Sequence, residues 1–171
     1  ICNHVYREDA VIVCAALGIF KKFHIPVFAK HLNNNVFYYW MIRYLGGIPI
    51  AETMGGMKEF NKALDTYHQR GEWIHVFPEE VRWDYYPYIR PFRKGPFTMA
   101  YKYKCPLLPL CIKFSDRGHI TIKILEPVFP DGSKTRESEV NRMREIAHSR
   151  MVEGMGIKNN PWPANPSDLD A

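Results

Sequence analysis

The sequence predicts an α/β fold, with a mostly parallel sheet flanked by helices and an antiparallel hairpin near the C-terminal end. Over most of the 171 residues, short apolar runs of strand length alternate with longer stretches of helical periodicity. Parallel strands joined by crossover helices give this pattern. Further on, two strand-like runs flank the turn residues 116–118, as in a hairpin. The length suits one domain, which we place at residues 1–157, followed by a Pro-rich tail over 158–171.

The first half of the chain predicts helices and strands in alternation. The expected elements are a buried helix over 10–20, a strand over 25–29, a helix over 37–44, a strand over 48–51 and a helix over 56–70. The last helix follows from apolar residues at every third or fourth position, namely Met57, Phe60, Leu64 and Tyr67. The segment 37–44 is apolar nearly all round, so we expect core packing there. Its Tyr and Trp content leaves a contact at a membrane interface as the alternative.

The second half adds a long loop to this alternation. We expect a strand over 73–77, a helix over 95–103, strands over 107–114 and 119–125, and a helix over 137–155. An apolar stripe of Val140, Met143, Ala147 and Met151 predicts the last helix. Residues 79–94 form a loop full of aromatic, Pro and Arg residues, and long ordered loops are usually functional. The tail from Pro161 shows no pattern that would pack.

The positive charge is concentrated in one segment. Residues 82–104 hold six Lys or Arg against one Asp, and their sum equals the net charge of +5 of the whole chain. Such a cluster indicates an anionic partner, and phosphate head groups, an acidic carrier protein and nucleic acid all fit. For any single residue of the segment, a solvated loop position is the alternative.

Several classes of protein are disfavoured by what the sequence lacks. No apolar run reaches the roughly 18 residues of a membrane-spanning helix, and no secretory signal opens the chain. The four cysteines form no C-x-x-C pair, so we expect reduced thiols in a cytosolic compartment and no metal. Neither the nucleophile elbow G-x-S-x-G nor the phosphate loop G-x-x-x-x-G-K-[ST] occurs. Since residue 1 is not methionine, we expect a piece of a longer protein.

His4 and Asp9 form a candidate acid–base pair. Histidine is the side chain whose unperturbed pKa suits proton transfer near neutral pH, and a carboxylate on its other ring nitrogen fixes the tautomer. On one helix, side chains five residues apart point about 140° away from each other. The two can therefore meet only if the chain changes conformation between them. We expect a strand that ends near Asn3 and a helix that begins near Asp9, where an acidic residue suits the first turn.

Four short stretches stand in order along the chain. They are Asn3-His4 with Asp9, then LGGIPI at 45–50, VFPEEVR at 76–82 and CPLLPLCI at 105–112. They resemble the blocks N-H-x-x-x-x-D, G-G-I-x-I-x-R, F-P-E-G-T-R-S and V-P-I-x-P-V of the glycerolipid acyltransferases. That family is typified by 1-acylglycerol-3-phosphate acyltransferase. The resemblance runs from Asn3 to about Val128, and residues 83–95 resemble a bacterial branch with an aromatic-rich loop.

The resemblance implies a glycerol-3-phosphate acyltransferase-like fold and an activity. That activity moves a fatty acyl group from a thioester, acyl-CoA or acyl carrier protein, to the hydroxyl of a lysophospholipid in phospholipid biosynthesis. The first acceptor it implies is 1-acylglycerol-3-phosphate, and it implies no cofactor. It also implies an anionic membrane surface as partner. The protein would lie on the cytoplasmic face of a membrane, either peripherally or anchored by a segment that precedes Ile1.

The resemblance further implies roles for single residues. His4 would be the base and Asp9 its orienting partner, with direct attack by the hydroxyl and no acyl-enzyme. Glu79 and Arg82 match third-block residues at which the glycerol phosphate is bound, and Lys30 matches a lysine near that site. A guanidinium is the natural fork for a phosphate. The alternative for Arg82 is a surface cation with Glu79 as its salt-bridge partner.

Two departures from the family pattern concern substrate binding. Glu80 stands where the third block has Gly, and residues 51–53 (AET) lack the arginine of the second block. One phosphate-binding cation is therefore missing, and an extra carboxylate stands close by. Arg90, Arg93 or Lys94 would replace the lost charge, so we add Arg93 and Lys94 to the substrate-binding set.

Three other functions stay open. The first is a lipid head-group-binding module with altered catalysis, which the substituted blocks favour and the intact His4–Asp9 pair disfavours. The second is an acyltransferase for an acceptor without phosphate. The third is a nucleic-acid-binding domain built on the basic segment and its aromatic residues. It leaves the ordered blocks unexplained, so we expect no nucleic-acid partner.

Overall fold

The structure is a computed structural model, which describes residues 1–18, 22–28, 46–50, 53–115 and 118–169 together with Trp40 and Tyr44. The chain divides into two compact units. One unit consists of Ile1–Asp9 with Phe77–Ala171, and the other of Ala10–Val76. The predicted division into residues 1–157 and a tail over 158–171 stays a prediction.

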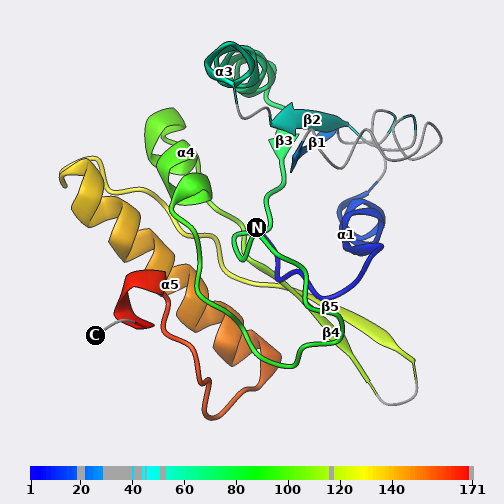
Figure 1. The fold of residues 1–171 in the computed structure, drawn as a ribbon. Helices are drawn as coiled ribbons and strands as arrows, with labels where there is room; N and C mark the ends of the chain where they lie inside the picture. Colours follow the sequence, from blue (N-terminus) through cyan, green and yellow to red (C-terminus); the bar gives the residue numbers. More distant parts are fainter. Residues whose placement is uncertain are drawn as a thin grey trace. The chain divides into compact units, whose positions relative to one another are not determined.

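The unit formed by residues 10–76 contains the parallel sheet that the sequence predicts. Helix α1 (Asp9–Leu17) leads into it, and the strands are β1 (Phe23–Phe28), β2 (Gly47–Ile50) and β3 (Trp73–Ile74), in the order β2-β1-β3. Both pairings are parallel. Helix α3 (Met54–Gln69) packs against β2 and β3 (Figure 1). Thr53 caps this helix, since its side chain accepts a hydrogen bond from the backbone N–H of Gly56 at 3.1 Å.

The conformation and surroundings of Gly46 explain why the second block has glycine at this position. Its φ is +79°, and a Cβ at this position would lie 2.0 Å from the carbonyl oxygen of Phe23. The same close approach lets the N–H of Ile25 donate to the carbonyl of Gly46 at 3.0 Å. A side chain here would therefore push apart β1 and the entry to β2.

The other unit contains the antiparallel pair and two helices. The pair is β4 (Leu110–Phe114) with β5 (Ile120–Ile124), and the helices are α4 (Gly95–Tyr103) and α5 (Arg136–Met155), followed by the 3-10 helix η2 (Pro166–Leu169). Helix α5 packs on α4 and β4 (Figure 1) and buries the predicted apolar stripe Val140, Met143, Ala147 and Met151. Cys2 pairs with Leu110 in a parallel bridge, which places the N-terminal segment beside β4.

Proline explains two strands that are shorter than predicted. The N–H of His75 donates to His24 at 2.7 Å, but the next donor in this ladder would be Pro26, which has no N–H. The strand expected over 73–77 is therefore limited to β3. In the same way, β4 begins only after Pro109, while Leu107 pairs separately with Val128.

Two helix expectations in the first half fare differently. The helix expected over 10–20 is present as α1, with Val13 buried, but Val11 is 43% exposed, so the helix is not buried throughout. The helix expected over 37–44 lies outside the described residues except for Trp40 and Tyr44, which are 49% and 85% exposed.

The tail packs through hydrogen bonds, against the expectation that nothing in it would pack. Asn160 donates to the carbonyl of Ile89 at 2.7 Å, and the indole N–H of Trp162 donates to the hydroxyl of Tyr86 at 2.8 Å. The N–H of Phe92 donates to the tail at Ala164. These bonds hold the tail along residues 86–92 of the long loop. They need no apolar periodicity, and a sequence pattern therefore does not show them.

Candidate active site

The side chains of His4 and Asp9 meet where the sequence predicts. Asp9 is the first residue of α1, and its side chain is fully buried. Its Oδ2 lies 3.0 Å from Nδ1 of His4 and accepts hydrogen bonds from the backbone N–H groups of Val5 (2.7 Å) and Tyr6 (2.9 Å). The turn over residues 5–8 thus wraps around the carboxylate. It provides the change of conformation that the five-residue spacing requires.

The pairing with Asp9 determines which nitrogen of His4 is available for chemistry. A carboxylate can only accept, so Nδ1 carries the proton and Nε2 presents its lone pair. No hydrogen bond from a described residue reaches Nε2. The imidazole stacks on Phe77 with ring centroids 4.1 Å apart, and 22% of the side chain is exposed. The ring is therefore held on one face and open to a ligand at Nε2.

Glu79 lies beside the backbone of His4 rather than on the surface. Its side chain has no exposed area, and its Oε2 accepts hydrogen bonds from Nε (2.8 Å) and Nη2 (2.7 Å) of Arg90. Burial raises the pKa of Glu79 to about 7, against the opposing charge of Arg90 and the hydrogen bonds from the backbone N–H groups of Arg90 and His4. The role of Glu79 in substrate binding stays a prediction. A substrate would reach its carboxylate only if the pair with Arg90 opened.

The remaining predicted cations lie in the same loop and are more exposed. Arg82 pairs with Asp84 at 2.7 Å, so the salt bridge to Glu79 considered for Arg82 is not formed. Arg93 pairs with the carboxylate of Glu80 at 2.8 Å, and its side chain is 65% exposed. Lys94 is exposed at the N-terminus of α4. Exposed pairs of this kind contribute about 0–1 kcal/mol, so a phosphate could displace either carboxylate.

The conformation of Glu80 explains the glycine that the family has at this position. Its φ is +67°, in the left-handed region that costs an ordinary residue about 1–2 kcal/mol. Glycine adopts this conformation without that cost. The turn is closed by hydrogen bonds from Glu80 N–H to Phe77 (3.1 Å) and from Val81 N–H to Glu79 (2.8 Å). The substitution therefore retains the turn of the third block at a steric cost.

The long loop runs directly beside the N-terminal segment. The N–H of Trp83 donates to the carbonyl of His4 at 3.2 Å, and the N–H of Tyr85 donates to Val5 at 2.8 Å. The basic loop and the candidate base therefore belong to one piece of structure. Whether the cationic side chains line the space in front of His4 stays a prediction, and Lys30 lies outside the described residues.

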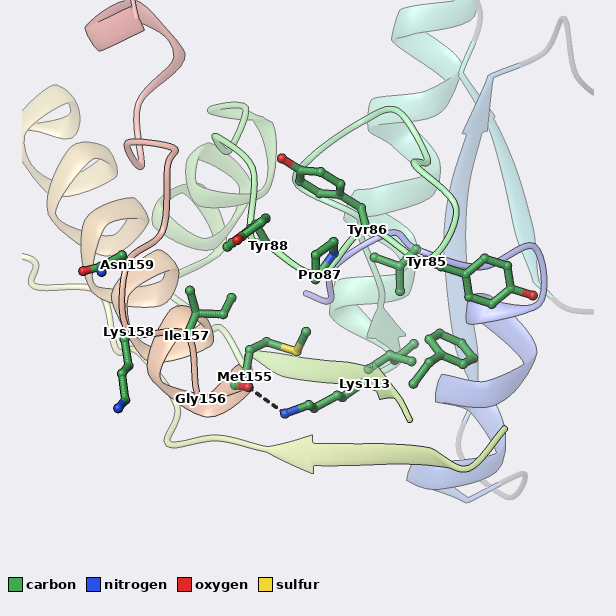
Figure 2. Close-up of a pocket in the computed structure, with 13 residues that line it drawn as sticks. Tyr85, Tyr86, Pro87, Tyr88, Lys113, Met155, Gly156, Ile157, Lys158 and Asn159 are labelled. Atoms are coloured by element: carbon green, nitrogen blue, oxygen red, sulfur yellow. Dashed lines mark hydrogen bonds between the residues drawn. The ribbon is translucent and has the colours of Figure 1, made fainter. Parts of the chain in front are cut away.

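A cavity of about 480 Å³ lies in the same unit, within the usual size range of small-ligand sites. Figure 2 shows the aromatic stretch 85–88 on one side and β4 with the C-terminal end of α5 on the other. Lys113 crosses it and donates to the carbonyl of Met155 at 3.2 Å. None of the six predicted site residues that the structure describes lines this cavity, although Val5 does. In the sequence, the aromatic residues of the loop are the one sign of this cavity.

The four cysteines do not compete with His4 as nucleophiles. All four are free thiols, and burial raises the pKa of each, that of Cys111 to about 12. A thiol with a raised pKa supplies little thiolate. Across the described ranges, no group of three or more His, Cys, Asp or Glu side chains could hold a metal ion. Nor does any helix in the described part of the chain have the length and apolarity to span a membrane.

Comparison with known proteins identifies the family. The acyltransferase family model matches residues 1–113, which include His4, Asp9 and the loop that holds Glu79. The chain belongs to the acyltransferase family. This membership supports acyl transfer as the reaction class, and it agrees with the resemblance seen in the four sequence blocks.

A solved structure shows that the fold is that of a known acyltransferase. The chain is similar to the 1-acyl-sn-glycerophosphate (LPA) acyltransferase, PlsC, from Thermotoga maritima, with a TM-score of 0.57 and 22% sequence identity. The match covers 93% of this chain but 66% of the Thermotoga chain. At this identity the likeness establishes the fold, as predicted, and not the substrate. A comparison with curated proteins found no match.

Proposed function

We propose that the chain transfers a fatty acyl group from a thioester to the hydroxyl of a lysophospholipid, with 1-acylglycerol-3-phosphate as the acceptor. One observation carries the proposal. Nδ1 of His4 is bound to the buried carboxylate of Asp9, while no described residue occupies Nε2. Family membership supports acyl transfer, and the fold shared with a protein named as an LPA acyltransferase supports this acceptor.

In the proposed mechanism, His4 moves one proton from the acceptor to the departing thiol. The acceptor hydroxyl attacks the carbonyl carbon of the thioester, and Nε2 takes the hydroxyl proton as the C–O bond forms. The tetrahedral oxyanion then collapses, the C–S bond breaks, and the imidazolium returns its proton to the thiolate. Asp9 stabilises the imidazolium in between and holds the ring in one orientation. No acyl-enzyme is formed.

The exposed cations are the proposed ligands of the acceptor phosphate. Among the described residues, Arg82 and Arg93 pair with exposed carboxylates, and each such pair contributes about 0–1 kcal/mol. Hydrogen bonds to a charged group contribute about 1.5–3 kcal/mol, so a phosphate dianion would displace Asp84 or Glu80. Lys94 and Lys30 complete the proposed set. The donor is either acyl-CoA or acyl carrier protein, since both present the same thioester.

An anionic membrane surface is the proposed setting of the reaction. Residues 82–104 carry a surplus of positive charge equal to that of the whole chain. Basic residues near an anionic lipid surface contribute about 1 kcal/mol each to binding. This attraction would bring the loop to the surface in which a lysophospholipid resides, in keeping with a role in phospholipid biosynthesis.

A second candidate acceptor is a lysolipid without a phosphate monoester. It is favoured by the observation that Arg82, Arg90 and Arg93 each already pair with a carboxylate. Without a phosphate ligand, these pairs would simply persist in the complex. The reaction and the roles of His4 and Asp9 are the same for both acceptors.

An acyl-transfer assay tests the proposal. Palmitoyl-CoA and palmitoyl carrier protein are each offered with lysophosphatidate and with an uncharged lysolipid, and His4→Ala serves as the inactive control. We expect transfer to lysophosphatidate with at least one donor. Transfer to the uncharged lysolipid alone would establish the second candidate. Absence of transfer with every pair, while both donors stay intact, would contradict the proposed function.

A further inference from the structure

The backbone of His4 is held on both sides by one short segment of the chain. The backbone N–H of His4 interacts with the buried carboxylate of Glu79 and lowers the pKa of that group. The carbonyl of His4 accepts a hydrogen bond from the N–H of Trp83 at 3.2 Å. Both partners belong to residues 79–83, which we call the brace. The backbone position of His4, and with it the position of its imidazole, therefore depends on the brace.

Arg90 ties the brace together. Its guanidinium bonds to Oε2 of Glu79 through Nε (2.8 Å) and Nη2 (2.7 Å), and it also donates to the carbonyl of Val81. It lies over the ring of Trp83, with its central carbon 4.6 Å from the ring centroid. One side chain thus contacts the brace at its start, its middle and its end.

The burial of Arg90 separates it from the other cations of the loop. The residue is 7% exposed, whereas the side chains of Arg82 and Arg93 are 40% and 65% exposed. Because Nε and Nη2 of Arg90 are bound to Glu79 and Val81 and the residue is nearly buried, Arg90 is less available to an incoming phosphate than Arg82 or Arg93. It does have the rigid fork that a lysine ammonium lacks.

We propose that Arg90 is a positioning residue for His4, acting through Glu79 and Trp83 rather than through contact with the substrate. The inference rests on the proposed function in one respect, that His4 is the base. It gives Glu79 a different role from the one expected from the sequence. Glu79 interacts with the backbone N–H of His4 and is in turn oriented by Arg90. The raised pKa of Glu79 agrees with a carboxyl group that its surroundings hold out of water.

The test compares Arg90→Gln with a matched variant elsewhere in the same unit. Arg142 also binds a carboxylate without exposed area, that of Glu139, and also donates to a backbone carbonyl, that of Phe129. None of these contacts involves residues 1–9. Arg142→Gln therefore removes the same groups from a pair with a buried carboxylate that does not touch His4.

The first readout is steady-state kinetics with lysophosphatidate. A misplacement of a catalytic group by about 1 Å can cost about 10²-fold in rate. We expect Arg90→Gln to lower kcat by about 10²-fold with an unchanged acceptor KM, and Arg142→Gln to leave both constants unchanged. Arg90→Lys, which keeps the charge without the fork, should recover part of kcat. If Glu79→Gln is combined with Arg90→Gln, the double variant should lose little more than the worse single variant.

The second readout needs no substrate. Nitrogen NMR of the histidine ring reports which nitrogen of His4 carries the proton. We expect one tautomer, protonated at Nδ1, in the unmodified protein and in Arg142→Gln, and a mixture in Arg90→Gln or, if that variant does not fold, in Arg90→Lys. This result would support the inference even if the assay found no acyl transfer, so the two proposals can fail separately.

Two results would overturn the inference. A raised acceptor KM with kcat retained in Arg90→Gln would make Arg90 a ligand of the acceptor. A lower melting temperature in both arginine variants, with kcat and the His4 tautomer unchanged in both, would make Arg90 a structural residue only.

Discussion

Two buried carboxylates in this protein have the same residue types around them and different electrostatics. Glu79 and Glu139 each lack exposed side-chain area, and each pairs with an arginine. Burial raises the pKa of Glu79 to about 7, whereas the hydrogen bonds from Arg142 lower the pKa of Glu139. For Glu79 the cost of burial outweighs the attraction of Arg90, whereas for Glu139 the hydrogen bonds from Arg142 outweigh the cost of burial.

The comparison shows that an ion pair cannot be interpreted from its residue types alone. Glu139 lies in the first turn of α5, where a carboxylate suits the helix N-terminus, and its Oε1 accepts a hydrogen bond from the N–H of Asp131 at 2.7 Å. It stabilises a helix start. The Glu79–Arg90 pair lies deeper and touches the backbone of His4. Only this pair is connected to the candidate base.

The largest expected effect is that of replacing His4, which interacts with the Glu79–Arg90 pair and not with the Glu139–Arg142 pair. His4→Ala removes proton transfer from the transition state, so we expect kcat to fall by about 10²- to 10⁴-fold with little change in acceptor KM. Glu139→Gln, at the pair without a link to His4, should leave kcat unchanged. Steady-state kinetics of the two variants measure this. A comparable loss of kcat in both variants would mean that the difference between the two pairs has no bearing on catalysis.

The pH dependence of stability should have opposite signs for the two carboxylates. Between about pH 4.5 and pH 7, folded Glu79 holds a proton that the unfolded chain has released, so its contribution to stability falls as pH rises, by up to about 3 kcal/mol. The contribution of Glu139 is present above the unfolded pKa and is lost as pH falls through its lowered folded pKa. Urea unfolding of Glu79→Gln and Glu139→Gln across this range gives both slopes. Glu79→Gln should flatten the fall between about pH 5 and pH 7, and an unchanged slope would contradict the raised pKa.

An exposed pair extends the comparison to substrate binding. Arg82 lies in an exposed pair with Asp84, so its removal should affect the fold little. If it holds the acceptor phosphate, Arg82→Ala loses about 1.5–3 kcal/mol, a rise of about 10- to 150-fold in the KM of lysophosphatidate. An uncharged lysolipid should be affected less. Equal weakening of both acceptors would show that Arg82 is not a phosphate ligand.

The smallest expected effect is that of replacing Glu80, whose backbone conformation is strained. Glu80→Gly removes a left-handed conformation that costs about 1–2 kcal/mol, offset by about 0.5–1 kcal/mol of backbone entropy. We expect a gain in stability of up to about 1 kcal/mol in chemical denaturation. The variant also frees Arg93 and removes a negative charge, so the KM of lysophosphatidate should fall. A loss of stability would show that the Glu80–Arg93 pair outweighs the strain.

The sequence predicted those features that depend on local pattern. The helices α3 and α5 follow from apolar periodicity, and α4 has the predicted bounds. The contact of His4 with Asp9 follows from their spacing together with the start of a helix. The strain at Glu80 was not predicted, since in the sequence the departure from the family's glycine indicates only an extra negative charge.

The features that the sequence did not predict depend on long-range geometry. Arg82 is the cation nearest to Glu79 in sequence, yet Glu79 pairs with Arg90, because the loop folds back over eleven residues. The two-residue length of β3 is set by Pro26, a residue of the neighbouring strand. The tail is fixed by hydrogen bonds from Asn160 and Trp162, for which no periodic pattern exists.

The most direct test of the account is the kinetics of Asp9→Asn. The amide oxygen can still accept the N–H groups of Val5 and Tyr6 and face Nδ1 of His4, so the variant removes the charge and keeps the geometry. Because a hydrogen bond to a charged group contributes about 1.5–3 kcal/mol, kcat for acyl transfer should fall by about 10- to 150-fold while the acceptor KM is retained. An Asp9→Asn variant with full kcat, or with a loss in KM alone, would contradict the assignment of His4 and Asp9 as the acid–base pair.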